Sequence, residues 1–336
     1  MKCLTLSNED FVCYTRHREW TSKQSNGCDP LFTKNAAVDI LVSGIQADLT
    51  LPFEVKYRRH GLSFIFGKAG GVDLWKTFMS NKVRAIMKEV NEIPVEAYDL
   101  VINDFEPVTA WACYMREHPC IGLSHQAAVL SKHSPVPDEV DMMGKFILKH
   151  YAPVDTSYGF HFQPYSESIF TPVIRQQIRM QHVSDSGHYT VYLPAYDDAR
   201  LLKNLLRFSD VRWEVFSKHN RVPFSLKNVN VQPIDNEKFI ASMASAHGIL
   251  CGAGFETPAE ALFLKKKLLV VPMKNQYEQH LNAAALKQMG IPVIKNLKPK
   301  NDAVIQEWLS TDHVVQVNYP DCTQEIIDKI LAKHSV

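Results

Sequence analysis

The sequence predicts an α/β protein made of two doubly wound domains that face a cleft. Short apolar runs alternate with helical segments through both halves, polar residues collect where the runs end, and the length of 336 residues suits two domains. Polar stretches at residues 164–172 and 181–187 interrupt the alternation. We therefore expect a domain boundary in this region, with residues 1–175 forming the first domain and residues 176–336 the second.

The first half is expected to contain four strands, which lie at residues 38–43, within 61–71, at 98–103 and at 120–123. Helices are expected from Asp73 to about Val90 and from Pro107, because aspartate and proline favour the start of a helix. This order of strands and helices is typical of a parallel sheet with helices on its faces.

Polar side chains follow the last two of these strands. Asp104 and Glu106 come after the third strand, and His125 and Gln126 come after the fourth. The carboxyl ends of parallel strands meet at one edge of a sheet, so Asp104, Glu106 and His125 are candidate catalytic residues. The alternatives are a capping or solvated acidic pair, and a histidine without a role in the reaction.

The second half repeats the pattern. Strands are expected at residues 189–193, 213–216, 229–233, directly before the glycine turn at Gly252, and at 268–271, and helices are expected from Asp197 and Asn236. Ser217 and Lys218 follow the second of these strands, where a lysine neutralises a phosphate charge. A solvated loop is the alternative. The charge run at residues 265–267 is expected to be a solvated helix end.

Residues 248–294 are the most informative stretch of the chain. An apolar run enters the turn G-A-G-F-E-T-P, where proline suits the first turn of a helix, and a second strand and a Gln/Glu-rich loop follow. The N–H groups at such a helix start favour phosphate. Glu260, one helical turn further on, suits vicinal hydroxyl groups. The alternative is a structural unit whose glycines only form tight turns.

This stretch resembles the donor half of GT-B glycosyltransferases, in which both domains are Rossmann-like. It is similar to bacterial family 1-like enzymes and, more distantly, to the peptidoglycan N-acetylglucosaminyltransferase and the glucuronosyltransferases. The resemblance is specific in this stretch and extends weakly over residues 31–295. In the G-x-x-T-x-x-E motif, it implies that Gly254 and Thr257 lie near the diphosphate and that Glu260 binds the ribose hydroxyls.

The resemblance also implies that a loop after the next strand meets the transferred sugar, with Asn282 behind it. The complete set of expected donor-binding residues comprises Gly252, Gly254, Phe255, Glu256, Thr257, Glu260, Gln276, Glu278, Gln279, Ser217 and Lys218. The first domain is then expected to bind the acceptor.

The implied function is transfer of a hexose-type sugar from a nucleotide diphosphate sugar, with UDP as the expected nucleotide, to an unknown glycan or lipid-linked acceptor. The nucleotide sugar is a co-substrate, and no cofactor is expected. The sequence contains no Asp-x-Asp motif and no histidine pair with metal-ligand spacing, so no metal site is expected and the mechanism is expected to be metal-independent. The alternatives are a sugar-nucleotide epimerase of the same fold and a pseudoenzyme. A dinucleotide-dependent oxidoreductase fits less well, because the spacing differs from G-x-G-x-x-G.

Bulk composition limits the partners and the compartment. The net charge of +1 gives no argument for nucleic acid. Seven scattered cysteines without a C-x-x-C motif suggest reduced thiols and a cytoplasmic protein, and neither a signal peptide nor a membrane span is recognisable. The basic residues 56–60 with Trp75, Phe78 and Met79 are candidates for peripheral contact with the inner face of the membrane. An ordinary mixed surface is the simpler interpretation.

Residues 8–30 do not fit this fold, because they are polar and aperiodic. Codons permitted for Asn8 onward, read one position later, give M-K-I-L-Y-A-I-Q-G-T-G-N-G-H-L-S-R-A-M-D-V-I-P. This peptide has an apolar strand and a glycine-rich turn, and it is similar to the opening that the family uses. We hypothesise that residues 8–30 are translated out of frame, through either a real pair of mutations or an error in the sequence. A buried strand and the turn whose histidine would serve as general base are then expected to be missing.

Overall fold

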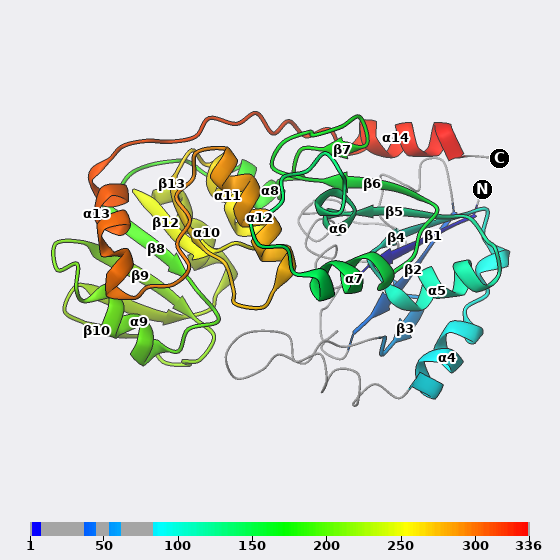
Figure 1. Cartoon of the computed structure of the whole chain (residues 1–336), viewed down its shortest axis with the longest axis horizontal. Coiled ribbons are helices and arrows are strands. Elements are labelled where there is room, and N and C mark those ends of the chain that lie inside the picture. Colours follow the sequence, from blue (N-terminus) through cyan, green and yellow to red (C-terminus); the bar gives the residue numbers. More distant parts are fainter. Residues whose placement is uncertain (1, 8–36, 45–53, 62–82, 335–336) are drawn as a thin grey trace.

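Two β-sheets form the framework of the molecule, and Figure 1 shows them in two lobes that lie side by side. The structure is a computed structural model that describes residues 2–7, 37–44, 54–61 and 83–334. The first sheet has the strand order β3-β2-β1-β4-β5-β6-β7, and the second has the order β10-β11-β9-β8-β12-β13. All pairs within both sheets are parallel, apart from β10 with β11. The expected α/β architecture is therefore confirmed.

The strands expected at residues 38–43, 98–103 and 120–123 are present in the first lobe, whereas those at 2–7, 57–59, 156–160 and 169–170 were not expected. The described elements of this lobe follow in chain order. They are β1 (Lys2–Ser7), β2 (Ala37–Ser43), β3 (Tyr57–Arg59), α4 (Val83–Glu92), the 3-10 turn η1 (Val95–Ala97), β4 (Leu100–Asp104), α5 (Pro107–Met115), β5 (Cys120–Ser124), α6 (His125–Val129), α7 (Met142–His150), β6 (Thr156–Phe160) and β7 (Ile169–Phe170). The strand expected within 61–71 and the start of the helix expected from Asp73 lie outside the described residues.

The second lobe adds the strands that precede the predicted donor site. Its elements are α8 (Gln176–Arg179), β8 (His188–Tyr192), α9 (Asp198–Leu205), β9 (Arg212–Ser217), β10 (Phe224–Leu226), β11 (Val229–Pro233), α10 (Asn236–Ser245), β12 (Gly248–Gly252), α11 (Glu256–Phe263), β13 (Lys267–Val271), α12 (Tyr277–Gln288), η2 (Pro299–Asn301), α13 (Asp302–Ser310) and α14 (Thr323–His334). The five strands expected from apolar runs in this half are all present. The short edge strand β10 was not expected, because it is exposed and carries no buried run.

The expected loss of a central strand from the first lobe is wrong. β1 lies between β2 and β4, and Cys3 pairs with both Val38 and Leu100 in parallel register. Ile40 and Val42 on the neighbouring strand are consequently buried. The expectation overlooked the apolar residues ahead of position 8, which are sufficient to form this strand. Residues 8–30 themselves lie outside the described part of the chain.

The C-terminal helix crosses back from the second lobe to the first. Figure 1 shows α14, coloured red, beside β7 of the first sheet. The Nε2 atom of His334 lies 3.0 Å from the hydroxyl of Tyr158 on β6, and the hydroxyl of Tyr319 donates to the carbonyl oxygen of Phe162 at 2.9 Å. The boundary at residue 175 stays a prediction, and α14 packs on the lobe that precedes this boundary.

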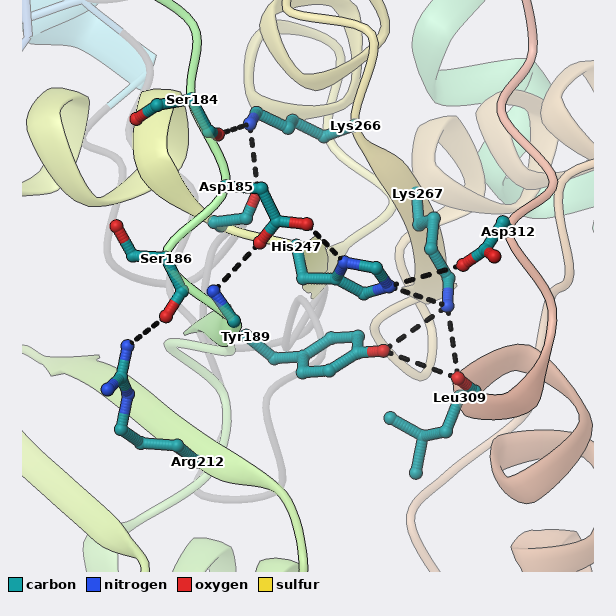
Figure 2. A network of polar contacts seen from close by, with 12 residues as sticks. Ser184, Asp185, Ser186, Tyr189, Arg212, His247, Lys266, Lys267, Leu309 and Asp312 are labelled. Atoms are coloured by element: carbon teal, nitrogen blue, oxygen red, sulfur yellow. Dashed lines mark hydrogen bonds and ion pairs between the residues drawn. The ribbon is translucent and has the colours of Figure 1, made fainter.

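The lysines at residues 266 and 267 are not a solvated charge run, which corrects that expectation. Both are buried, and burial lowers the pKa of each. Figure 2 shows Lys266 donating to the carbonyl oxygen of Ser184, and Lys267 donating to the Tyr189 hydroxyl and to the carbonyl oxygen of Leu309. β13 begins at Lys267, so these side chains enter the amino-terminal edge of the sheet. There they tie the segment before β8 and the end of α13 to the sheet.

Candidate functional site

Loops at the carboxyl ends of β8, β12 and β13 line a cleft of about 1410 Å³. The opposite wall comes from the first lobe, where residues 135–141 precede α7. The cleft lies where a parallel α/β sheet usually binds its ligand, outside the carboxyl ends of the strands. Its volume exceeds the roughly 300–1,000 Å³ that is usual for the site of one small molecule.

The turn between β12 and α11 exposes backbone to this cleft. Gly252, Gly254 and Thr257 line it. No described atom lies within 4 Å of the position that a Cβ would take at Gly254, so the space in front of this turn is open. Among the described residues, no side chain caps the start of α11. The N–H groups of its first turn can therefore bind an anion in the cleft.

Glu260 lies deeper than the sequence implies. It is buried and outside the cleft lining, and both of its carboxylate oxygens accept hydrogen bonds from Arg175. Burial raises the pKa of Glu260, and the Arg175 guanidinium opposes that shift. Arg175 also donates to the side-chain oxygen of Asn236 at 3.0 Å. The ribose role of Glu260 stays a prediction, and in this structure its partner is an arginine.

The residues of the predicted sugar loop face different parts of the molecule. Gln279 lines the cleft, and its Oε1 accepts a hydrogen bond from the backbone N–H of Met273 at 2.8 Å. Glu278 instead faces the first lobe, where Gln126 donates to its Oε2 at 3.3 Å. Burial raises the pKa of Glu278 and the hydrogen bond from Gln126 opposes this shift. Gln276 precedes α12 and lies outside the cleft lining.

His125 joins the first lobe to the turn between β12 and α11. Its Nδ1 lies 2.7 Å from the carbonyl oxygen of Phe160, and its Nε2 lies 2.8 Å from Oδ1 of Asn282. The amide nitrogen of Asn282 donates to the carbonyl oxygen of Ala253, so its oxygen faces the imidazole. Both ring nitrogens thus face acceptors, and both bonds form only when each nitrogen carries a proton. His125 also stacks on Phe255 with a centroid distance of 3.9 Å. These contacts indicate that His125 links the first lobe to α12 and to the start of α11 in the second lobe.

Asp104 and Glu106, the acidic pair at the end of β4, also differ in their surroundings. Glu106 is completely buried, and its oxygens accept from the backbone N–H groups of Val108 and Thr109 at 2.7 and 2.8 Å. Burial raises its pKa, and its hydrogen bonds to Thr109 oppose the shift. Glu106 therefore caps α5, which is the alternative that the sequence left open, and its catalytic role stays a prediction. Asp104, the last residue of β4, is buried too, and its catalytic role stays a prediction.

The remaining predicted residues lie outside the cleft lining. Ser217 ends β9 and donates to the carboxylate of Asp198, while Lys218 is exposed. Phe255 and Glu256 immediately precede and begin α11. The structure therefore brings Gly252, Gly254, Thr257 and Gln279 together in the cleft lining. It places the other predicted donor residues outside that lining.

Sequence reasoning missed two parts of the cleft. One is the wall formed by residues 135–141. The other is a group of exposed cations on the second lobe, which we name the cationic wall: Arg200, Lys274, Lys287, Lys295 and Lys298. Within the part of the chain that the structure describes, none of these five forms an ion pair with a carboxylate. Lys287, Lys295 and Lys298 lie close together in the sequence, whereas Arg200 on α9 joins them only through the fold.

Over residues 2–7, 37–44, 54–61 and 83–334, no group of three or more histidine, cysteine, aspartate or glutamate side chains is arranged to hold a metal ion. In the same residues, no helix is long and apolar enough to span a membrane.

Comparison with known proteins identifies similar sequences and folds. The model of the family described as "Glycosyl transferase family 1" matches residues 28–311. None of the curated proteins matches the chain. MurG of Acinetobacter baumannii is 13% identical with a TM-score of 0.56, covering 98% of this chain and 100% of its own.

Two further similar structures are complexes with nucleotide ligands. UGT89C1 of Arabidopsis thaliana, complexed with UDP-L-rhamnose, is 10% identical with a TM-score of 0.60, covering 100% of this chain and 99% of its own. SsfS6 of Streptomyces sp. SF2575, complexed with thymidine diphosphate, is 12% identical with a TM-score of 0.53, covering 98% and 99%. At these identities the likeness shows a common fold.

Proposed function

Because the chain belongs to glycosyl transferase family 1 and has the GT-B fold, we propose that it transfers a hexose-type sugar from a nucleotide diphosphate sugar to a glycan or lipid-linked acceptor. UDP is the proposed nucleotide, as in the similar UGT89C1 complex. The nucleotide sugar is the co-substrate, and the reaction proceeds without a metal. The proposed compartment is the cytoplasm, which fits the four described cysteines that form no disulfide.

The uncapped start of α11 is the observation that carries this proposal. Gly254 leaves open space in front of N–H groups that lie at the cleft, and Thr257 adds a hydroxyl. A leaving diphosphate carries negative charge, and a helix N-terminus stabilises such charge without a metal ion. Gln279 lines the same cleft and is the proposed contact of the sugar. Glu260 remains the proposed contact of the ribose.

Substitution at Gly254 tests the phosphate site. A valine side chain at this position meets no described atom within 4 Å of its Cβ, so Gly254→Val is expected to fold normally. The valine would occupy the space that the diphosphate needs. Calorimetry with UDP, thymidine diphosphate and their sugars is expected to show binding to the unmodified chain and at least a tenfold loss in the variant. Equal affinities in both chains would contradict this position of the diphosphate.

Product analysis separates transfer from the alternatives. A glycosyltransferase releases nucleoside diphosphate and joins the sugar to an acceptor hydroxyl. An epimerase would convert the bound sugar without any acceptor, and a pseudoenzyme would bind the donor without either change. Chromatography of the donor with and without a panel of acceptors therefore distinguishes the three functions.

We also propose that residues 8–30 are translated out of frame. The family match begins at residue 28, close to the end of this stretch, which agrees with a change of frame there. Sequencing of the 5′ end of the gene tests the proposal directly. DNA that does not encode the shifted peptide in the second frame would rule it out.

A further inference from the structure

Five large apolar side chains are exposed beside the cleft, and we name them the α7 ledge. They are Val136, Val140, Met142, Met143 and Phe146, with exposed fractions of 61%, 45%, 72%, 57% and 61%. They follow one another along the loop before α7 and the first turns of the helix. A contiguous exposed apolar patch of this kind usually marks a binding site.

The opposite side of α7 is fixed to the second lobe. A Cβ at Gly144 would approach the Tyr277 Cβ to 2.5 Å, so only glycine permits this close packing against the start of α12. Leu148, one turn further along α7, packs on a small cluster of Tyr277, Leu281 and Val129. Figure 1 shows α7 at the boundary between the lobes. The ledge is therefore held in a defined position relative to the proposed sugar loop.

The ledge is continuous with the cleft. Val136 and Val140 line the cleft itself, and Met142, Met143 and Phe146 extend the apolar surface outward from its rim. The cleft of about 1410 Å³ is larger than the roughly 300–1,000 Å³ of a usual small-molecule site. It has room for a second substrate beside a nucleotide sugar, and the ledge lies where an extended part of that substrate would leave the cleft.

The two walls of the cleft differ in charge. Asp138, Glu139 and Asp141 stand on the first-lobe loop, and the five residues of the cationic wall stand on the second lobe. The start of α11 already supplies N–H groups for a diphosphate. The five cations, which form no ion pair with a carboxylate of the described residues, favour an additional anionic group on the second-lobe side, away from the acidic loop.

We propose that the acceptor is amphipathic, with an apolar portion that binds the α7 ledge and an anionic group that binds the cationic wall. This inference rests on the proposed transferase function. The apolar portion would lie across Met142, Met143 and Phe146, and the acceptor hydroxyl would enter the cleft between Val140 and Gln279. The α7 ledge then selects acceptors by their apolar part, and the cationic wall selects them by charge.

Soluble amphiphiles test the two surfaces separately. Decyl phosphate, decyl glucoside and inorganic phosphate are titrated by calorimetry below their micelle concentrations, and the methyl signals of Met142 and Met143 are followed by NMR after ¹³C-methyl-methionine labelling. We expect decyl phosphate to bind most tightly and to shift both methyl signals. The double variant Met143→Gln/Phe146→Ser is expected to lose at least tenfold in affinity for both decyl compounds.

The double variant Lys295→Gln/Lys298→Gln tests the cationic wall. Its affinity for decyl phosphate should fall about tenfold, and its affinity for decyl glucoside should stay unchanged. Met180→Gln is the matched control, since Met180 is equally exposed at 68% and lies outside the cleft lining. It should bind like the unmodified chain. Equal affinity of the ledge variant and the control would overturn the proposal.

If the α7 ledge binds something other than an acceptor, the binding experiments give different results. Binding to phosphatidylglycerol vesicles without binding to monomeric decyl phosphate would assign the ledge to a membrane surface and overturn the proposal. Light scattering that shows a dimer, dissociated by Met143→Gln/Phe146→Ser, would assign it to a second copy of the chain and overturn it too. UDP affinity is measured in every variant. If the unmodified chain does not bind UDP, the donor assignment is refuted. The measurements with the decyl compounds then still show whether the α7 ledge binds an amphiphile.

Discussion

Glu260, the proposed contact of the donor ribose, already forms an ion pair with Arg175. Both carboxylate oxygens of Glu260 accept from the guanidinium, and the pair is almost completely buried. Removing one member of a buried ion pair leaves the other charge without compensation. The effect of Glu260 on nucleotide binding must therefore be separated from its effect on folding.

Glu260→Gln is expected to weaken nucleotide binding at least tenfold, because hydrogen bonds to a charged carboxylate contribute about 1.5–3 kcal/mol each. Calorimetry with UDP measures this loss, and thermal unfolding shows whether the fold persists. Arg175→Gln is the matched variant, since it breaks the same ion pair and keeps the carboxylate. An equal loss of UDP affinity in both variants would mean that the ion pair, rather than a ribose contact, controls binding.

His161 is expected to make the folded state sensitive to acid. Burial lowers the pKa of His161 from 6.5 to about 2, and the neighbouring His125 adds to this shift. Below about pH 6.5 the unfolded chain takes up a proton that the folded chain does not, so stability decreases as the pH falls towards 2. Between pH 6.5 and 4.5 this loss of stability amounts to about 2.3 kcal/mol, because the unfolded histidine is half protonated at pH 6.5 and almost fully protonated at pH 4.5.

His161→Asn removes this titration and keeps an acceptor for the Phe162 N–H, which now bonds to Nδ1 of His161 at 2.9 Å. Urea unfolding at pH 6.5 and 4.5 should show a smaller loss of stability in the variant than in the unmodified chain. The same loss in both chains would show that His161 is not neutral in the folded state.

At the scale of elements, α12 connects the two lobes. Its first turns carry Gln279 in the cleft lining, Glu278 against Gln126 of α6, and Tyr277 against Gly144 of α7. A change in the packing of α6 or α7 is therefore transmitted to the proposed sugar loop. No single helix could have suggested this, because each contact joins segments that are more than 130 residues apart.

Gly144→Ala tests this connection. The added methyl group would approach the Tyr277 Cβ to 2.5 Å, so α7 must shift, at an expected cost of about 1–3 kcal/mol in unfolding free energy. We expect the KM for the acceptor to rise more than the dissociation constant for UDP, since α7 belongs to the acceptor side. Thermal unfolding and steady-state kinetics measure the two effects. A rise in both constants by the same factor would argue against separate acceptor and donor sides.

At the scale of the whole molecule, the chain combines the second sheet with a first sheet in which β1 is an internal strand between β2 and β4. The turn around Gly254 and Gln279, which we propose to bind the donor, belong to the second lobe, so we expect donor binding to persist whatever the sequence of residues 8–30. The general base expected from the family resemblance belongs to the glycine-rich turn of the shifted peptide. The chain is therefore expected to bind the donor and to transfer its sugar poorly.

Replacing residues 8–30 by the shifted peptide is expected to raise turnover by a factor on the order of 10²–10⁴, which is the usual contribution of a general base. UDP affinity should stay unchanged, because the donor contacts are the same in both chains. Initial rates with one donor and one acceptor provide the comparison. Equal turnover would mean that the glycine-rich turn does not carry the base.

Local patterns in the sequence determined the strands, the helix starts and the phosphate turn. The apolar run 268–271 is buried on both faces of a parallel sheet, and the proline after Glu106 marks the start of α5. The motif around Gly254 located the start of α11 at the cleft, where we propose that the diphosphate binds, since the signal is contained in consecutive residues.

Only the tertiary structure decided which side chains share a surface. Arg175 reaches Glu260 across 85 positions, and His125 reaches Asn282 across 157, so the partner of each residue could not be read from its neighbours. The same holds for the cationic wall and for the α7 ledge, whose place beside the cleft follows from the packing of Gly144 on Tyr277. Burial and charge at these sites depend on contacts between distant segments, which exist only once both sheets have formed.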